Sequence, residues 1–189
     1  MKLIFKNKNN FNINDYPYNI DKKGNEIKRE NYKYIKCITY SIMFIISVIV
    51  IFFVMINKNI ISEIYNIFVG LLLGFLSLPV HEILHAIWYK DETYLYMDFF
   101  RGNAFVISKE VVKRNKYIFI SLFPNIILGI LPTMIGILFR NTFLCFFGLY
   151  NFFIGIYDFI NIFYVYKNVP KTSKIFLNKN GGFWIWTRK

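Results

Sequence analysis

Four long apolar segments constrain the fold of this chain more than any other feature of its sequence. They run over residues 37–56, 60–89, 117–139 and 143–166. Each has at least the roughly 20 residues that a helix needs to cross a hydrocarbon core about 30 Å thick. They lack the polar face that the helices of a soluble bundle turn towards water. The sequence therefore predicts an α-helical integral membrane protein with four transmembrane helices.

The basic residues alternate between rich and poor connecting segments. Nine Lys and Arg residues precede the first apolar segment, one follows it, six separate the second from the third, one separates the third from the fourth, and six follow the fourth. Basic residues gather on the cytoplasmic side of a membrane protein. We therefore expect a multi-pass protein of the cell membrane with both termini in the cytoplasm.

This orientation divides the chain into three parts. A basic cytoplasmic arm covers residues 1–36, a four-span membrane domain covers 37–166, and a basic cytoplasmic tail covers 167–189. The formal net charge of +12 is explained by the membrane orientation, because the basic residues cluster beside the apolar segments. We therefore expect no nucleic-acid partner.

Strand-forming residues occupy the long connection between the second and third spans. Residues 94–100 are rich in Tyr and Phe, residues 101–103 (Arg-Gly-Asn) can form a turn, and an apolar run resumes over 104–107. This order predicts a small β-hairpin on the cytoplasmic side of the membrane.

Both histidines of the chain lie in the second span, in the run His81-Glu82-Ile83-Leu84-His85. On a helix, a spacing of four residues places two imidazoles on one face, where they can share a metal ion. Glu82 can then accept a proton from water at the metal, because Zn²⁺ lowers the pKa of such water to about 7. The alternative is a set of hydrogen-bonded polar residues inside a bundle. Three ionisable residues within five positions of a span are costly, however, and favour a functional site.

A catalytic zinc site needs a third protein ligand. No histidine remains, and only Glu63, Glu82 and Asp158 of the eleven acidic residues lie within the apolar segments. Glu63 is about five helical turns from His81, so it cannot reach the site. Asp158 and His81 each lie eight residues before the predicted cytoplasmic end of their span. We therefore predict His81, His85 and Asp158 as metal ligands and Glu82 as the catalytic base. The alternative for Asp158 is a polar clamp hydrogen-bonded to a neighbouring helix.

The order of these residues resembles a known family. The His81–His85 motif near the end of one span, Phe123-Pro124-Asn125 in the next, and Asn151 and Asp158 in the last resemble a family of small bacterial membrane proteins described as zincin peptidases. The layout is also similar to that of site-2 proteases, in which an Asp on a later span completes the zinc site. Phe159 follows Asp158 here, where site-2 proteases typically carry Gly. The resemblance covers about residues 60–166.

This resemblance implies Zn²⁺ as the cofactor and hydrolysis of peptide bonds as the reaction. Together with the apolar segments, it predicts a zinc-dependent metalloprotease that acts within or beside the membrane. Its expected partners are the lipid bilayer and a peptide or membrane-protein substrate. The alternative is a non-catalytic metal-binding scaffold or transporter subunit, which would use the same ligands but would not need Glu82. The oligomeric state stays open.

Overall fold

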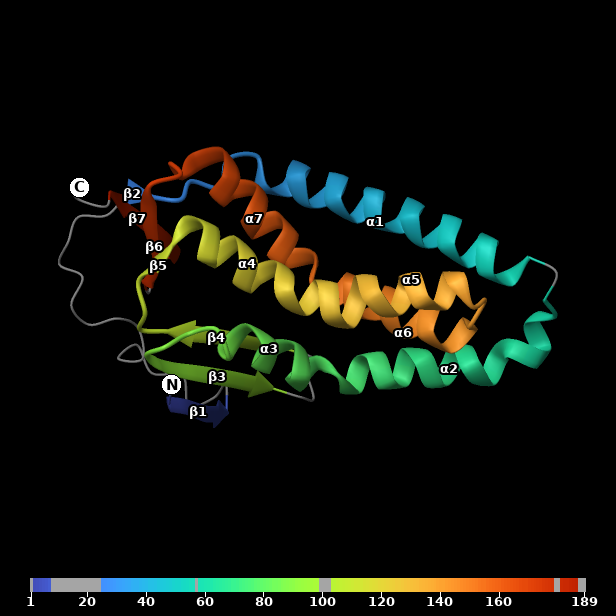
Figure 1. Ribbon diagram of the computed structural model, residues 1–189. Helices are drawn as coiled ribbons and strands as arrows, with labels where there is room; N and C mark the ends of the chain where they lie inside the picture. The colour runs from blue at the N-terminus through green and yellow to red at the C-terminus, as the bar shows by residue number, and fades with distance from the viewer. Residues whose placement is uncertain (1, 8–24, 57, 99–102, 179–180, 187–189) are drawn as a thin grey trace. The chain divides into compact units, whose positions relative to one another are not determined.

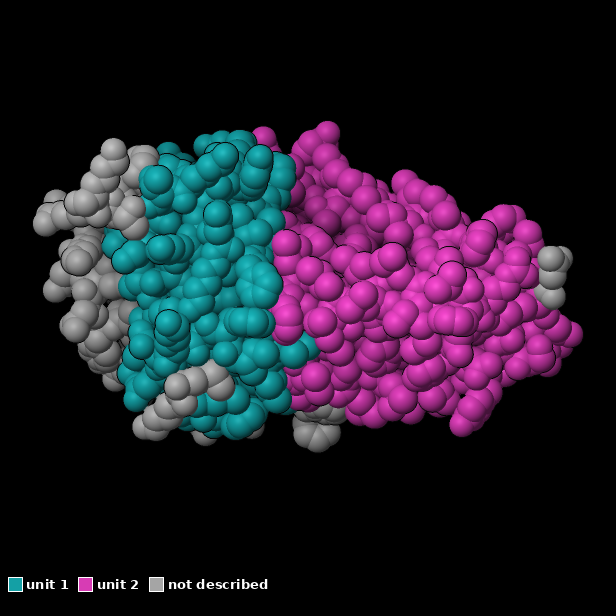
Figure 2. Space-filling model, viewed as in Figure 1, with its two compact units in different colours: residues 1–30, 82–121, 161–189 teal, residues 31–81, 122–160 magenta. Residues whose placement is uncertain are grey.

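The computed structural model of the chain describes residues 2–7, 25–56, 58–98, 103–178 and 181–186 (Figure 1). The chain divides into two compact units, which Figure 2 shows in different colours. Unit 1 contains residues 1–30, 82–121 and 161–189, and unit 2 contains residues 31–81 and 122–160. Each unit is therefore assembled from segments that are far apart in the sequence.

Unit 2 is built from apolar helices. Its complete helical elements are α1 (Tyr32–Met55), α2 (Ile60–Leu76), the π-helix η4 (Asn125–Ile130), α5 (Leu131–Leu138) and α6 (Thr142–Ile154). It also contains the first residues of α3 (Leu78–Ala86) and α7 (Ile156–Asn168), and the end of α4 (Arg114–Pro124). Because the apolar side chains of these helices cover every face, many of them remain exposed, as expected of helices in lipid.

The packing of α2 against α6 depends on two glycines. A Cβ atom at Gly70 would lie 2.8 Å from the carbonyl oxygen of Phe143, and one at Gly74 would lie 2.8 Å from Cβ of Tyr150. The two glycines are four residues apart, so both face the same side of α2 and let the two backbones approach closely. Any side chain at either position would push these helices apart.

Two helices are long and apolar enough to cross a membrane, namely α1 and the continuous helix that α4, η4 and α5 form over Arg114–Leu138. Two further pairs satisfy the same criterion only when they are taken together. These are α2 with α3, which are bent by 42°, and α6 with α7, which are bent by 48°. The described residues thus contain two to four candidate spans, and the four predicted segments coincide with them.

The two bends differ from the unbroken segments that the sequence predicted. Pro79, the second residue of α3, has no N–H group and cannot donate to the carbonyl of Phe75, so the helix breaks at Ser77. The Ser77 hydroxyl lies 2.8 Å from Oδ1 of Asn151, which is fully buried on α6. Gly155 separates α6 from α7. Each bend therefore lies a few residues before a predicted metal ligand.

Unit 1 contains a three-stranded sheet in the order β1-β3-β4. The strands β3 (Glu92–Asp98) and β4 (Asn103–Ser108) are antiparallel neighbours at the position of the predicted hairpin, whose residues 99–102 lie outside the described residues. Strand β1 (Lys2–Asn7) pairs with β3 in parallel. No pattern in the basic arm predicted this strand, and the cytoplasmic side of the hairpin stays a prediction.

A second sheet of unit 1 joins the arm, the middle connection and the tail. Its four strands have the order β2-β7-β6-β5 and are antiparallel, with bounds Asn25–Glu26 (β2), Val112–Lys113 (β5), Ser173–Asn178 (β6) and Gly181–Trp186 (β7). Described parts of the basic arm and tail are thus paired with the rest of unit 1.

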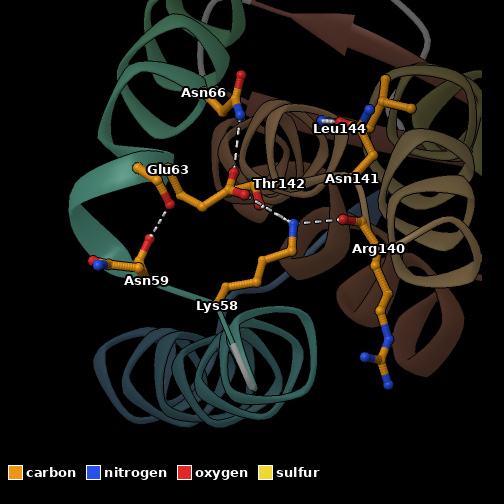
Figure 3. Close-up of polar contacts among 9 residues, drawn as sticks. Lys58, Asn59, Glu63, Asn66, Arg140, Asn141, Thr142 and Leu144 are labelled. Carbon is orange, nitrogen blue, oxygen red and sulfur yellow. Dashed lines mark hydrogen bonds and ion pairs between the residues drawn. The ribbon is translucent and has the colours of Figure 1, made fainter.

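A polar cluster joins the connection between α1 and α2 to the connection between α5 and α6 (Figure 3). The ammonium group of Lys58 donates to the carbonyl oxygen of Arg140 at 2.7 Å and to the hydroxyl of Thr142 at 2.9 Å. The carboxylate of Glu63 lies 3.2 Å from the same ammonium. We call this cluster of Lys58, Glu63, Arg140 and Thr142 the Lys58 clamp. It places three acceptors around one cation at the end of unit 2.

Candidate metal centre

The helix α3 carries three of the predicted site residues on a short, buried segment. The exposed fractions are 1% for His81, 8% for Glu82 and 8% for His85. The two histidines are one helical turn apart on this helix and face the same side. Two imidazoles and a carboxyl group removed from water need polar partners, because burying such groups alone is costly.

His81 meets the predicted third ligand within unit 2. Its Nε2 atom lies 3.2 Å from Oδ2 of Asp158, the third residue of α7. The ligand atoms of a tetrahedral zinc site with bonds of about 2.1 Å lie roughly 3.4 Å apart. The spacing of these two atoms therefore suits two neighbouring ligands of one ion.

Asn125 holds the same carboxylate oxygen from a second side. Its Nδ2 group donates to Oδ2 of Asp158 at 3.0 Å, and the Asn125 side chain is fully buried. Asn125 is the first residue of the π-helix η4, an irregularity that is frequent at functional sites. The orientation of the Asp158 carboxylate is thus fixed by a partner that is itself fixed by packing.

The second histidine is oriented by a backbone carbonyl within unit 1. Nδ1 of His85 lies 2.9 Å from the carbonyl oxygen of Ile120. In a regular helix this oxygen would accept a hydrogen bond from the N–H of residue 124. That residue is Pro124, which has no N–H group, so the carbonyl is free of its helical partner. We infer that Nδ1 of His85 carries the proton and donates, which leaves Nε2 with a lone pair for a metal.

One ligand atom from each of His81, His85 and Asp158 lies within 4.8 Å of the others. Among the described residues, these three side chains form a group that could hold a metal ion. Two imidazoles and one carboxylate match the donor set of catalytic zinc sites, which keep a fourth position open. The residues present therefore fit a zinc ion. Glu63 is a member of the Lys58 clamp instead.

Sequence reasoning missed part of this arrangement. The sequence indicates Asn125 as one of three asparagines that could orient ligands, bind a substrate backbone or simply hydrogen-bond a neighbouring helix. It indicates no role for Pro124, Ile120 or Gly155. The signals were present, because an in-helix proline always frees one carbonyl and an Asn inside an apolar segment needs a hydrogen-bond partner. The location of the partners follows only from the fold.

Ionisable residues within helices that are apolar and long enough to cross a membrane mark functional sites, and this buried group of two histidines and one aspartate has the donor set of a metal site. The sequence model of the family described as "Putative zincin peptidase" matches residues 74–173, which is more than half of the chain. The chain belongs to this family. No curated protein and no solved structure matches the chain significantly. The family description suggests a metallopeptidase that uses zinc.

Proposed function

We propose that this protein is a membrane-embedded zinc peptidase. The observation that carries the proposal is the group of His81, His85 and Asp158, whose ligand atoms lie within 4.8 Å of one another. Two of these residues lie on α3 and the third on α7, and both helices belong to candidate spans that bend close to the group. The family match covers all three residues.

Each residue of the site would have its own role in the reaction. His81, His85 and Asp158 would hold the metal, while Asn125 and the Ile120 carbonyl orient two of these ligands. Zinc bound there would polarise the scissile carbonyl and lower the pKa of water to about 7. Glu82, which follows His81 on α3, would accept the proton of the attacking water and pass it to the leaving amine. Its 8% exposure keeps the carboxylate away from bulk water.

The proposal also includes the topology of the chain in the membrane and the location of the substrate. Each bent pair would form one span, which gives four spans with both termini in the cytoplasm and a cytoplasmic hairpin β3–β4. The substrate would be a peptide segment within or beside the bilayer, as in the site-2 proteases, whose layout the sequence resembles. The alternation of basic residues along the chain supports this topology.

The test is a comparison of Glu82→Gln with the unaltered protein, both purified in detergent and loaded with zinc. The zinc content is measured by elemental analysis, and cleavage of a synthetic transmembrane peptide is followed by mass spectrometry. Asp91→Asn is the matched control, because it removes a carboxylate that is exposed and outside the helices. We expect Glu82→Gln to retain zinc and to lose cleavage at least 100-fold, since general base catalysis contributes about that much.

Two results would contradict the proposal in different ways. Cleavage by Glu82→Gln at the unaltered rate would remove the proposed mechanism and favour the non-catalytic metal-binding protein. Zinc contents that are equally low in the unaltered protein and in His81→Ala would remove the metal site itself. Asp91→Asn should behave like the unaltered protein in both measurements.

A further inference from the structure

The N-terminal end of α1 carries a second group of polar side chains, which the proposed peptidase reaction does not use. Lys36 and Tyr40 lie one turn apart on α1, and Tyr157 lies on α7 within the same unit. The Lys36 ammonium donates to the hydroxyl oxygen of Tyr157 at 3.1 Å. It also lies 5.3 Å from the ring centre of Tyr157 and 5.7 Å from that of Tyr40.

This group offers more hydrogen-bond donors than it satisfies. An ammonium group has three N–H bonds, and Lys36 uses one of them on the Tyr157 hydroxyl. The Tyr157 hydroxyl also forms a hydrogen bond with the hydroxyl of Tyr40. The two remaining N–H bonds of Lys36 have no acceptor among the described residues and can donate to a bound ligand.

The group also carries an unbalanced positive charge. Among the described residues, Lys58, Lys109 and Lys116 each contact a carboxylate within 3.2 Å, whereas no carboxylate pairs with Lys36. Two N–H donors on one cation without a carboxylate partner match the oxygens of a phosphate group, which accepts charge-assisted hydrogen bonds. A ligand with a net negative charge fits this group, since there is no carboxylate to receive a cationic head group.

The surroundings indicate where such a phosphate comes from. Tyr40 is 39% exposed and Tyr157 is 48% exposed, so both rings lie on the outer surface of their helices. Further along the same side of α1, Phe44 and Val48 lie one and two turns after Tyr40 and are 64% and 49% exposed. An apolar surface beside a donor group suits a molecule with both a phosphate and acyl chains, and Tyr residues and basic residues are enriched at this depth of a membrane.

We propose that Lys36, Tyr40 and Tyr157 bind the phosphate of an anionic phospholipid at the N-terminal end of α1. The Lys36 ammonium donates to the phosphate oxygens, while the Tyr157 hydroxyl and the rings of Tyr40 and Tyr157 hold the ammonium in place. The acyl chains lie along the exposed apolar side chains of α1. This site is independent of the proposed peptidase activity, because it needs neither the metal nor Glu82.

The experiment places the full-length protein in nanodiscs with equal amounts of phosphatidylglycerol and phosphatidylcholine. After transfer to detergent, native mass spectrometry counts the phosphatidylglycerol molecules that the protein retains. Lys36→Gln is compared with Lys33→Gln, which removes the same charge from an exposed position less than one turn earlier on α1. We expect Lys36→Gln to weaken retention about tenfold, the loss of a charge-assisted hydrogen bond, while Lys33→Gln stays within twofold of the unaltered protein.

Tyr157→Phe is the second variant, because it keeps the ring and removes only the hydroxyl. We expect it to weaken retention about threefold, as the loss of one hydrogen bond should. Equal retention in Lys36→Gln and Lys33→Gln would overturn the site, because only general charge attraction would remain. Full displacement of the lipid by inorganic phosphate would also overturn the proposal, because the group would then bind free phosphate without help from acyl chains.

Discussion

The amide of Asn125 fills the space beside Gly155 that any other residue would need for its side chain. A Cβ atom at Gly155 would lie 1.5 Å from Oδ1 and 2.4 Å from Cγ of Asn125. Gly155 separates α6 from α7, and Asn125 begins the π-helix η4. The same amide donates to Asp158, three residues after the glycine. The bend between α6 and α7 and the orientation of a proposed metal ligand thus depend on one contact.

Gly155→Ala should weaken zinc binding without touching any ligand. The added methyl group must displace the Asn125 amide, and Asp158 then loses the partner that orients its carboxylate. Changes to groups that orient metal ligands typically cost 10- to 100-fold in metal affinity, so we expect about tenfold. The measurement is a zinc titration against a competing chelator in detergent.

A double variant tests whether the effect acts through Asn125. Asn125→Ala alone should also lower the affinity about tenfold, because it removes the same hydrogen bond. In Gly155→Ala/Asn125→Ala the displaced amide is gone, so the two losses should not add. Fully additive losses would show that Gly155 acts on the metal site by another route.

Lys58→Met should reduce stability while leaving zinc affinity unchanged. It removes a cation that holds Arg140, Thr142 and Glu63 together (Figure 3). Hydrogen bonds from charged groups contribute about 1.5–3 kcal/mol each when they are sheltered. Since Lys58 is 23% exposed, we expect a loss of about 1–2 kcal/mol in total.

The measurement is thermal unfolding in detergent, followed by circular dichroism, with the zinc titration as the second readout. Lys33→Met is the control, because Lys33 is exposed at the start of α1 and is not part of this cluster. An unfolding midpoint of Lys58→Met equal to that of the control would contradict a stabilising role for the clamp.

The sequence predicts the helical part of this fold well, because the signal is local. Long apolar runs identify the helices directly, and the four predicted segments coincide with the two long helices and the two bent pairs. The bends between α2 and α3 and between α6 and α7 were not predicted, because the hydropathy of a segment does not depend on whether its helix is straight. Their causes, Pro79 and Gly155, are visible in the sequence, but a Gly or Pro inside an apolar run does not by itself show whether the helix breaks.

The sheets were largely beyond prediction. The hairpin β3–β4 was accessible because its strands are neighbours in the sequence. The pairing of β1 with β3 joins residues about 90 positions apart, and β2 pairs with β7 across most of the chain. Such pairings leave no signal in the local sequence, because the partner lies far along the chain and the stability of a strand depends on that partner.

The third ligand of the candidate site could be predicted by elimination, because few ionisable residues lie within the apolar segments. Two histidines and three acidic residues within the apolar segments left Asp158 as the predicted third ligand, and the structure brings it to His81. Its role as a ligand stays a prediction. Of the groups that orient these side chains, Asn125 could be named from the sequence as a candidate. The Ile120 carbonyl could not, because only the fold shows that it meets His85.

The ion pair between Lys109 and Glu92 makes a pH-dependent contribution to the hairpin of unit 1. The carboxylate of Glu92, at 2.6 Å, raises the pKa of the Lys109 ammonium, and Tyr94 adds to this effect. A raised lysine pKa stabilises the fold below the unfolded value of about 10.4, and this stabilisation is lost as the pH rises further. Both side chains are about one-third exposed, so we expect less than about 1 kcal/mol.

Lys109→Gln should therefore lower the unfolding midpoint slightly and by a constant amount between about pH 6 and pH 9. The difference from the unaltered protein should shrink only above about pH 10.4. Lys113→Gln is the control, because Lys113 is exposed on β5 and pairs with no carboxylate among the described residues. A difference that disappears between pH 6 and pH 9 would contradict this assignment.

Pro124→Ala tests the link between a helix irregularity and the tautomer of His85. Alanine restores an N–H group that can donate to the Ile120 carbonyl, which is the acceptor for Nδ1 of His85. A carbonyl has two lone pairs, so the competition is partial. We expect a regular helical hydrogen bond, a weaker hold on the His85 ring, and a loss of about threefold to tenfold in zinc affinity.

Pro132→Ala is the matched control, because Pro132 lies at the start of α5 in the same candidate span. Both variants remove one proline from this helix, but only Pro124→Ala affects the carbonyl that orients His85. The nitrogen chemical shifts of His85 report its tautomer directly, and they should show protonated Nδ1 in the unaltered protein and in Pro132→Ala. Unchanged shifts and unchanged zinc affinity in Pro124→Ala would mean that the Ile120 carbonyl holds His85 whether or not the helix competes for it, because its second lone pair would then be sufficient.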